Sequence, residues 1–234
     1  MSFTLYNYVL SGNCYKVRLL ASLLNVSHDT IAVDFHPGQE HKSEALLQIN
    51  PAGTLPILVA DSLVLTETQA ILVWIANRFD QKGSWWPSDN EDKVASVLQW
   101  LGFSSRLSAT VGELRLHSML NKTIDVQAAS SGSKRVLREL ESHLSEQRIR
   151  GHMWLTGDTP TVADIACFPY TALSPDAGID HDDYPAIRRW LHALRSLDGF
   201  ITMPGIHELH ENHGSDARVA KIEVSSNTNA GADQ

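Results

Sequence analysis

Residues 50–72 read NPAGTLPILVADSLVLTETQAIL, and this stretch determines how the chain is expected to fold. Two apolar runs, 56–59 and 63–65, are joined by the short link 60–62, which favours an antiparallel hairpin. Apolar residues then recur at helical spacing from Thr68 onward, and the Thr68 hydroxyl is placed to cap the free amides of that helix. The sequence therefore predicts a hairpin that is followed directly by a helix.

The residues before this hairpin predict a β-α-β unit. Residues 3–8 have a strand pattern, and residues 14–24 carry apolar side chains at helical spacing. Ile31 and Val33 mark a second short strand, and residues 43–48 a short helix. Together with the hairpin they give the order β-α-β-α-β-β-α around a mixed sheet.

The strand patterns stop after residue 80. Ser88 and Glu91 match a capping box, so a long helix is expected from there to about His117. Further helices are expected at 133–147, 162–170 and 186–197. The expected organisation is an α/β domain at 1–81, a link at 82–87, an all-α domain at 88–213 and a flexible tail at 214–234.

Composition excludes several classes of function. The chain has 234 residues, of which 43% are hydrophobic and 20% charged, and its net charge of −8 disfavours binding to nucleic acid. No apolar run is long enough to cross a membrane or to act as a signal peptide, so we expect a soluble cytoplasmic protein without membrane contact.

The residues also give no sign of a metal or a nucleotide cofactor. The only two cysteines, Cys14 and Cys167, lack the spacing of a zinc site. His207, His210 and His213 recur every third residue, which is not the zincin pattern. The chain contains neither a GxGxxG turn nor a GxxxxGK loop, so we expect no nucleotide cofactor.

The segment Ser11-Gly12-Asn13-Cys14 joins the first strand to its helix and could hold an anion. Free amides and the positive end of the helix dipole gather at such a junction. A thiolate is an anion of this kind, because a small thiol with a pKa of about 8.5 is only slightly ionised at neutral pH without help. Two ordinary alternatives remain: Ser11 caps the helix, and Cys14 is a buried, inert thiol.

The loop 50–56 could bind a peptide backbone. A cis Leu55–Pro56 bond would turn the Leu55 amide and carbonyl outward, where they could pair with an extended ligand. The alternative is a plain trans turn, which is the commoner form of an X-Pro bond.

Two further segments could bind the charged ends of a small ligand. Glu67 offers a partner for an ammonium group, and Thr68 with the first-turn amides can hold a carboxylate. His41 and Lys42 could hold a second carboxylate. The alternatives are a simple helix cap and a solvated loop.

In their order and spacing these segments resemble the amino-terminal thioredoxin-like domain of cytosolic glutathione transferases. The quoted pieces are SGNCYKVRLL, GQEHKS, NPAGTLPILV and LTETQAILVWIANRF, followed by DTPTVADIA at 158–166 in the helical half. The last piece resembles the family's internal capping box, in which Thr161 and Asp164 cap a buried helix. The resemblance implies an α/β thioredoxin-like domain followed by an all-α domain.

The resemblance also implies glutathione as co-substrate. Its γ-glutamyl end would lie at Glu67 and Thr68, its cysteinyl backbone at Leu55, and its glycyl carboxylate near His41 and Lys42. The remaining implied contacts are Asn13, Thr54 and Pro56, although many relatives carry a basic residue where this chain has Thr54.

The residue that serves the glutathione sulfur stays open. Ser11 matches the serine that stabilises the thiolate in theta-like and delta-like members. Cys14 lines up with the cysteine that beta-like members use to form a mixed disulfide with glutathione. The resemblance therefore implies a glutathione transferase that attacks a small hydrophobic electrophile, with a reductase or lyase acting through Cys14 as the alternative. A non-catalytic glutathione-binding regulatory module is a third reading.

The helical half should supply the electrophile pocket. The candidates on the long helix are Phe103, Arg106, Leu107 and Thr110, with ordinary core packing as the alternative for each. The resemblance further implies a homodimer that forms through the third and the long fourth helices.

Overall fold

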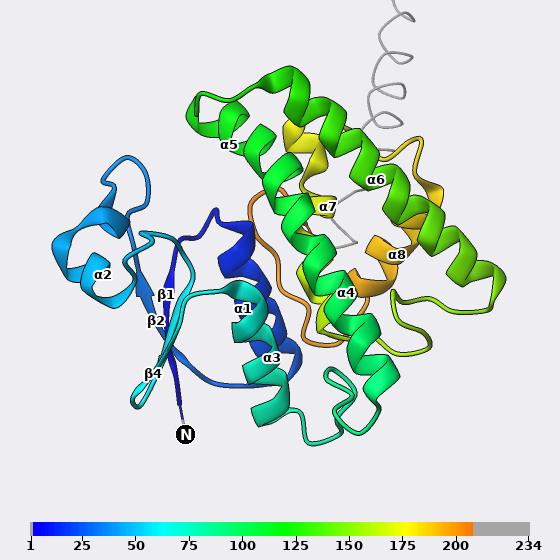
Figure 1. Ribbon diagram of the computed structural model, residues 1–234, viewed down its shortest axis with the longest axis horizontal. Helices are drawn as coiled ribbons and strands as arrows, with labels where there is room; N and C mark the ends of the chain where they lie inside the picture. Colours follow the sequence, from blue (N-terminus) through cyan, green and yellow to red (C-terminus); the bar gives the residue numbers. More distant parts are fainter. Residues whose placement is uncertain (1, 208–234) are drawn as a thin grey trace, which may run out of the picture.

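The computed structural model describes residues 2–207 and begins with a mixed sheet of four strands (Figure 1). The elements of this first part are β1 (Thr4–Asn7), α1 (Gly12–Leu23), β2 (Asp29–Ala32), α2 (Glu44–Ile49), β3 (Ile57–Ala60), β4 (Leu63–Leu65) and α3 (Thr68–Phe79). The strand order is β2-β1-β3-β4. β1 runs parallel to β2 and antiparallel to β3, and β3 pairs with β4 as an antiparallel hairpin. The expected thioredoxin-like order and the mixed sheet are confirmed.

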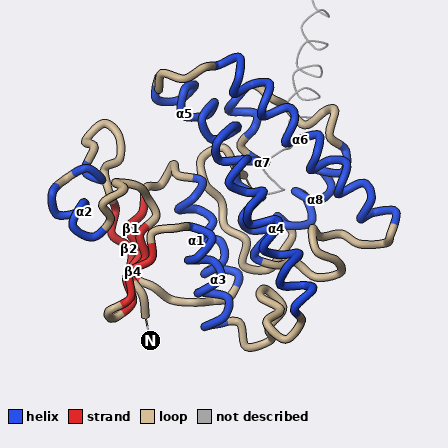
Figure 2. Tube along the Cα trace, viewed as in Figure 1, coloured by secondary structure: helices blue, strands red, loops and turns tan. Residues whose placement is uncertain are grey.

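The second part consists of helices. They are α4 (Glu91–Leu107), α5 (Glu113–Leu120), α6 (Val126–Ile149), α7 (Val162–Ala172) and α8 (Pro185–Arg195). Helices α1 and α3 lie between the sheet and this helical part, whereas α2 lies on the other side of the sheet (Figures 1 and 2). Helix α7 packs against α1, α3 and α4, and every residue from Val162 to Pro169 is buried. The two parts therefore share one continuous apolar core.

The internal capping box at the start of α7 is confirmed. The Thr161 hydroxyl accepts a hydrogen bond from the Ala163 amide, and the Asp164 carboxylate accepts one from the Thr161 amide at 2.9 Å. Asp164 is fully buried and also accepts hydrogen bonds from the Leu155 amide and the Trp190 indole. Burial raises the pKa of the Asp164 carboxyl above its usual value, while these donors oppose the rise. Asp164 thus joins three segments of the helical core.

Two expected helix caps are wrong. The Thr68 hydroxyl does not cap α3, because the chain is still extended at Glu67 and Thr68 is the first helical residue. Ser88 does not start the long helix either, because Asn90 occupies the cap position and its side chain accepts from the Lys93 amide at 3.0 Å.

The long helix is also not uniform to His117. Helix α4 ends at Leu107, a π-helical segment spans Ser108–Gly112, and α5 continues from Glu113. This insertion changes which residues face the first part of the chain.

Within residues 2–207 no helix is both long and apolar enough to cross a membrane. His210, His213 and the tail 214–234 lie outside the described residues.

Candidate active site

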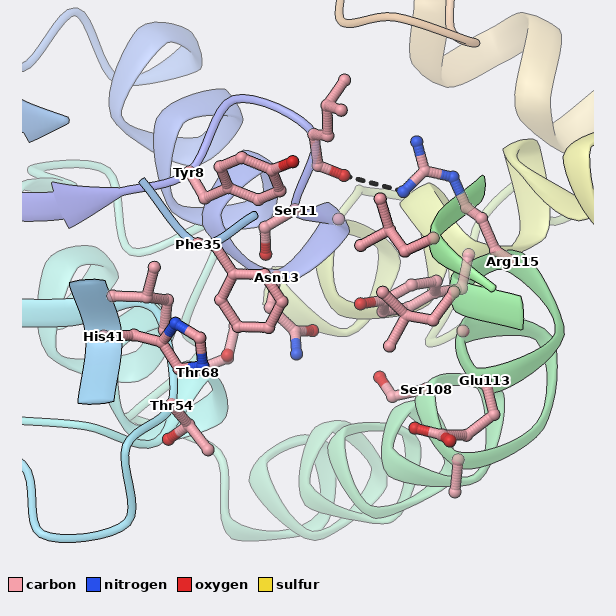
Figure 3. A pocket seen from close by; sticks show the side chains of 18 of the residues that line it. Tyr8, Ser11, Asn13, Phe35, His41, Thr54, Thr68, Ser108, Glu113 and Arg115 are labelled. Carbon is pink, nitrogen blue, oxygen red and sulfur yellow. Dashed lines mark hydrogen bonds between the residues drawn. The ribbon is translucent and has the colours of Figure 1, made fainter. Parts of the chain in front are cut away.

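A pocket of about 490 Å³ lies between the two parts of the molecule (Figure 3). The loop between β1 and α1 and the loops that precede β3 and α3 form one wall. Helix α4, the π-helical segment, α5 and Tyr170 of α7 form the other wall. Figure 3 shows Ser11 and Asn13 across the pocket from Ser108 and Glu113. Residues of both parts of the molecule therefore border one pocket.

Ser11 is the N-cap residue of α1 and lines this pocket. Its backbone is extended, and its side-chain oxygen accepts a hydrogen bond from the Cys14 amide at 3.2 Å. That bond uses a lone pair of the oxygen, so the hydroxyl hydrogen remains available for a ligand. The positive end of the α1 dipole lies at the same point. Ser11 is thus placed to stabilise a negative charge.

Cys14 is not brought into the pocket. Its side chain is fully buried in a small apolar cluster with Val33, Leu46, Leu55 and Ile57. Its sulfur accepts a hydrogen bond from the Tyr8 amide at 3.4 Å. Burial raises the pKa of the Cys14 thiol, and this effect outweighs the contacts that lower it. The expectation that Cys14 acts on a substrate therefore has no geometric support, because a buried protonated thiol is a poor nucleophile.

Most of the expected glutathione contacts do come together. The residues that line the first wall of the pocket include Asn13, His41, Thr54, Leu55, Glu67 and Thr68. Lys42 and Pro56 do not line it. The Lys42 ammonium is exposed and donates to the Gln39 side chain, and Pro56 is buried behind Leu55. The Leu55–Pro56 bond is cis, as the peptide-binding interpretation requires.

The two ends of this wall differ in charge. Glu67 is exposed, makes no side-chain cap bond and borders the pocket beside the first free amides of α3. His41 is only 6% exposed and stacks on Phe35 at 4.0 Å between ring centroids. Burial lowers the pKa of His41, so its ring is mostly neutral at pH 7. His41 can then serve a carboxylate as a hydrogen-bond donor rather than as a cation.

The loop that presents Leu55 is held by Asn50, which the sequence analysis did not single out. The Asn50 side chain donates to the Thr54 carbonyl at 2.8 Å and accepts from the Ala52 amide at 3.1 Å. Asn50 is 2% exposed. A buried amide side chain that bonds its own loop in this way holds the Leu55 backbone in a defined position for a ligand.

The four residues expected to form the electrophile pocket lie elsewhere. Phe103 packs on Trp100, and the Arg106 guanidinium pairs with Glu139 on the outer side of α4. Leu107 is fully buried in the core, and the Thr110 hydroxyl donates to the Arg106 carbonyl. Phe103 and Arg106 border a separate shallow hollow.

The true pocket face of this helix is displaced by two residues. It includes Ser105, Ser108, Ala109, Gly112, Glu113 and Leu116. A shift of two residues turns a helix by about 200°, so the expected residues lie on nearly the opposite side. The prediction failed because apolar periodicity marks the buried stripe of a helix, whereas this pocket face carries serines, alanine and glycine.

Two pocket residues carried no signal in the sequence, Arg115 and Tyr170. Arg115 is 4% exposed, and its guanidinium donates to the Leu10 carbonyl at 2.7 Å and to the Asp176 carboxylate at 2.9 Å (Figure 3). Arg115 thus ties α5 to the residue that precedes Ser11. Tyr170 reaches the pocket from α7. A lone arginine and a lone tyrosine within helical patterns look like ordinary surface and core residues, so only the folded chain distinguishes them.

The rim of the second wall carries one ion pair. Both oxygens of Glu113 accept from the Lys122 ammonium, at 2.8 and 2.6 Å. Beyond this pair the wall continues with Leu116, Met119 and Leu120. This wall therefore presents hydroxyls near Ser11 and apolar side chains further out.

Two family models match the chain. The model described as "Glutathione S-transferase, N-terminal domain" matches residues 1–77, and that described as "Glutathione S-transferase, C-terminal domain" matches residues 126–193.

Similar sequences come from animals and fungi. Glutathione S-transferase theta-2 of Mus musculus is 30% identical over 173 residues, which cover 70% of this chain and 68% of the relative. Glutathione S-transferase 2 of Anopheles gambiae is 29% identical over 186 residues, which cover 78% of this chain and 86% of the relative. Protein URE2 of Kluyveromyces marxianus is 26% identical over 233 residues, but the match spans only 57% of that longer protein.

Similar solved structures include a possible glutathione S-transferase from Rhodopseudomonas palustris, with a TM-score of 0.78 and 29% identity over 87% of this chain and 98% of that one. Ure2p in complex with glutathione has a TM-score of 0.75 and 26% identity over 85% of this chain and 96% of that one.

Proposed function

Because this chain belongs to the glutathione S-transferase family, we propose that it is an enzyme that activates the thiol of glutathione at Ser11 for attack on a small, mainly hydrophobic electrophile. The observation that carries the proposal is the position of Ser11. Its hydroxyl lies at the amino end of α1 and borders the same pocket as Leu55, Glu67 and Thr68.

Glutathione would lie along the first wall of the pocket. The ammonium of its γ-glutamyl end would pair with Glu67, and the carboxylate of that end would accept from the first amides of α3 at Thr68. The cysteinyl backbone would pair with Leu55 as an added strand. The glycyl carboxylate would accept from His41, with Thr54 and Asn13 completing the contacts.

The Ser11 hydroxyl would donate to the sulfur and stabilise the thiolate. Lowering a thiol pKa by about two units from about 8.5 corresponds to roughly 2.7 kcal/mol of preference for the thiolate. One hydroxyl donor and the free amides at the start of α1 can together supply a stabilisation of this size. The remaining acceleration would come from holding the sulfur and the electrophile side by side in one pocket.

Matched alanine variants test the assignment. We expect glutathione to bind in a calorimetric titration and wild type to conjugate it to at least one member of an electrophile panel. Ser11→Ala should lower kcat/KM by about 100-fold, the equivalent of about 2.7 kcal/mol, and should raise the pKa of the bound thiol. Cys14→Ala is the control and should keep kcat/KM within about threefold, because the buried thiol does not reach the pocket.

Three other results would contradict the proposal. Loss of turnover in Cys14→Ala with activity retained in Ser11→Ala would support the reductase or lyase. Binding of glutathione without turnover of any electrophile would support a binding module. Absence of binding would remove all of these functions.

We also propose that the protein forms a homodimer through α3 and α4, as the resemblance implies, together with the neighbouring strand β4. Support comes from apolar side chains that remain exposed there: Leu63 and Val64 of β4 are 37% and 42% exposed, and Leu98 of α4 is 52% exposed. Exposed apolar residues of this size commonly mark protein interfaces.

A further inference from the structure

Lys16 is a charged residue enclosed in the core between the two parts of the molecule. It belongs to α1, which packs against α7, and its side chain has no exposed surface. In the part of the chain that the structure describes, residues 2–207, no carboxylate pairs with it. A buried charge destabilises a fold unless polar partners compensate for the loss of water. Packing alone would therefore be served better by an uncharged side chain at this position.

The Lys16 ammonium is stabilised by Asn13 and by an aromatic ring. It donates to the side-chain oxygen of Asn13 at 2.9 Å and lies 5.0 Å from the centroid of the Tyr170 ring. The neighbouring Cys167 thiol carries no charge at neutral pH, because burial raises its pKa. Burial also lowers the pKa of Lys16 to about 8, so most of the lysine still holds its proton at pH 7. Lys16 is thus a cation that donates to Asn13.

This hydrogen bond fixes which end of the Asn13 side chain faces the pocket. An amide side chain has an oxygen that accepts and an NH2 group that donates, and the two ends have nearly the same size. Because an ammonium can only donate, the Asn13 oxygen must face Lys16, and the NH2 group is left on the pocket side. Figure 3 shows the side chains of Asn13 and Ser11 reaching into the pocket from the same wall. Within residues 2–207, nothing accepts from that NH2 group, so it is available to a ligand.

From this arrangement we propose that Lys16 is a positioning residue, which turns the NH2 group of Asn13 toward the sulfur of glutathione and so gives the thiolate a second donor beside Ser11. The inference rests on the proposed function and adds to its thiolate site one donor and the residue that orients it. Lys16 does not touch the ligand itself, because its side chain is fully buried and does not border the pocket. Without the ammonium, the Asn13 side chain can turn over and present its oxygen, which repels a thiolate.

Lys16→Met tests the proposal, because it replaces the ammonium with an uncharged side chain of similar length. Two probes are compared: glutathione, whose sulfur ionises, and S-methylglutathione, whose sulfur cannot. We expect the pKa of the bound glutathione thiol, measured from the ultraviolet absorbance of the thiolate, to rise by about one unit from about 6.5, as for loss of one hydrogen bond to a charged group. The Kd of glutathione at pH 7.5 should then rise by about fivefold, and the Kd of S-methylglutathione by less than about twofold.

A double-mutant cycle tests whether Lys16 acts through Asn13. Asn13→Ala removes the NH2 group but keeps the backbone amide of α1, and it should raise the pKa of the bound thiol by the same amount, about one unit. Combining it with Lys16→Met should add less than about 0.3 units, because the two residues act as one unit. A direct effect of the Lys16 charge on the sulfur would instead make the two shifts add.

Lys93→Met is the matched control for the loss of one positive charge, because Lys93 is an exposed lysine of α4 that does not border the pocket. It should leave the pKa of the bound thiol and both Kd values unchanged. A merely structural role for Lys16 would instead weaken the binding of both probes to the same extent in Lys16→Met.

An unchanged thiol pKa in Lys16→Met, shifts that add in the double variant, or equal losses of affinity for the two probes would each overturn the proposal. A wild-type protein that binds neither probe, or a thiol pKa that stays unchanged in Ser11→Ala, would overturn the proposed function instead.

Discussion

Lys16 is a fully buried lysine within the first helix, and its ionisation should be visible in the stability of the protein. Burial lowers its pKa from 10.5 to about 8, with the neighbouring Cys167 acting in the opposite direction. Between these two values the native chain has released the lysine proton while the unfolded chain still holds it. The unfolded state then binds more protons, so the free energy of unfolding rises with pH across that window.

We therefore expect Lys16 to add about 2 kcal/mol to the stability of wild type relative to Lys16→Met between pH 7 and pH 9.5, since 1.5 pKa units are worth about 2 kcal/mol. The comparison with the variant is needed because burial raises the pKa values of Cys14 and Cys167, which act in the opposite direction in both proteins. Urea unfolding at both values of pH measures the gain. Lys16→Met removes the titrating group and should abolish it. If the free energy of unfolding of Lys16→Met rose with pH as much as that of wild type, groups other than Lys16 would cause the pH dependence.

Arg115 forms a buried ion pair, whereas Arg106 forms an exposed one. The Arg115 side chain is 5% exposed and bonds both Asp176 and the Leu10 carbonyl, whereas the side chains of Arg106 and Glu139 are 47% and 48% exposed. Breaking a buried pair leaves an uncompensated charge and a carbonyl without its donor. An exposed pair is screened by water.

Arg115→Met should accordingly lower the free energy of unfolding by about 3 kcal/mol, and Arg106→Met by less than about 1 kcal/mol. Chemical denaturation of the two variants alongside wild type gives both values. Equal losses in the free energy of unfolding would mean that the contacts of Arg115 stabilise the fold no more than a surface ion pair does.

Single residues were predictable from sequence only where a local motif constrains them. Ser11, Leu55 and Asp164 each follow from a junction, a loop or a capping pattern, and the structure places each near the expected element. The contacts of Arg115 with Leu10 and of Tyr170 with Gly12 join residues that are at least 105 positions apart, and no local pattern encodes such contacts. Cys14 shows the converse, since its position suggests reactivity but packing buries it.

At the scale of elements, the π-helical segment Ser108–Gly112 places a glycine where Tyr170 passes. Gly102, within α4, has no atom within 4 Å of the position of an added Cβ, whereas at Gly112 that position is 3.0 Å from the Tyr170 ring. Alanine favours a helix over glycine by about 1 kcal/mol where the extra methyl group has room.

Gly102→Ala should therefore stabilise the protein by about 0.5 to 1 kcal/mol. Gly112→Ala should be less stable than Gly102→Ala by about 2 kcal/mol, because the ring must move. The difference in urea midpoints between the two variants is the measurement. Equal stabilisation would show that the ring has room to shift without cost.

The order of the elements was predictable, because hydrophobic periodicity and turn residues mark each of them. The sheet with its hairpin and the helical second part follow the expected order. The ends of the helices and the face of α4 were not predictable. Asn90 rather than Ser88 caps α4, and the π-helical segment shifts the register that straight periodicity assumes. Both depend on how the helix packs, which a local pattern does not record.

At the scale of the whole molecule, the proposed dimer has a direct test. Sedimentation of wild type should give about twice the chain mass of 25.9 kDa. Val64→Lys combined with Leu98→Asp should give the mass of one chain, because charges in an apolar interface are costly to bury. Ile149→Lys is the control: Ile149 is 85% exposed but lies at the end of α6, far from β4 (Figure 1), and its replacement should leave the mass unchanged. A wild-type protein that sediments as one chain would remove the dimer.

Neither of the two cysteines of this chain has exposed surface in the folded protein. A maleimide added to the native protein should consequently find no thiol to modify, and each covalent adduct must report an opening of the core around Cys14 or Cys167. The rate at which each cysteine is modified then measures how often the core opens around it. Cys14 reports on the first part of the molecule and Cys167 on the helical part.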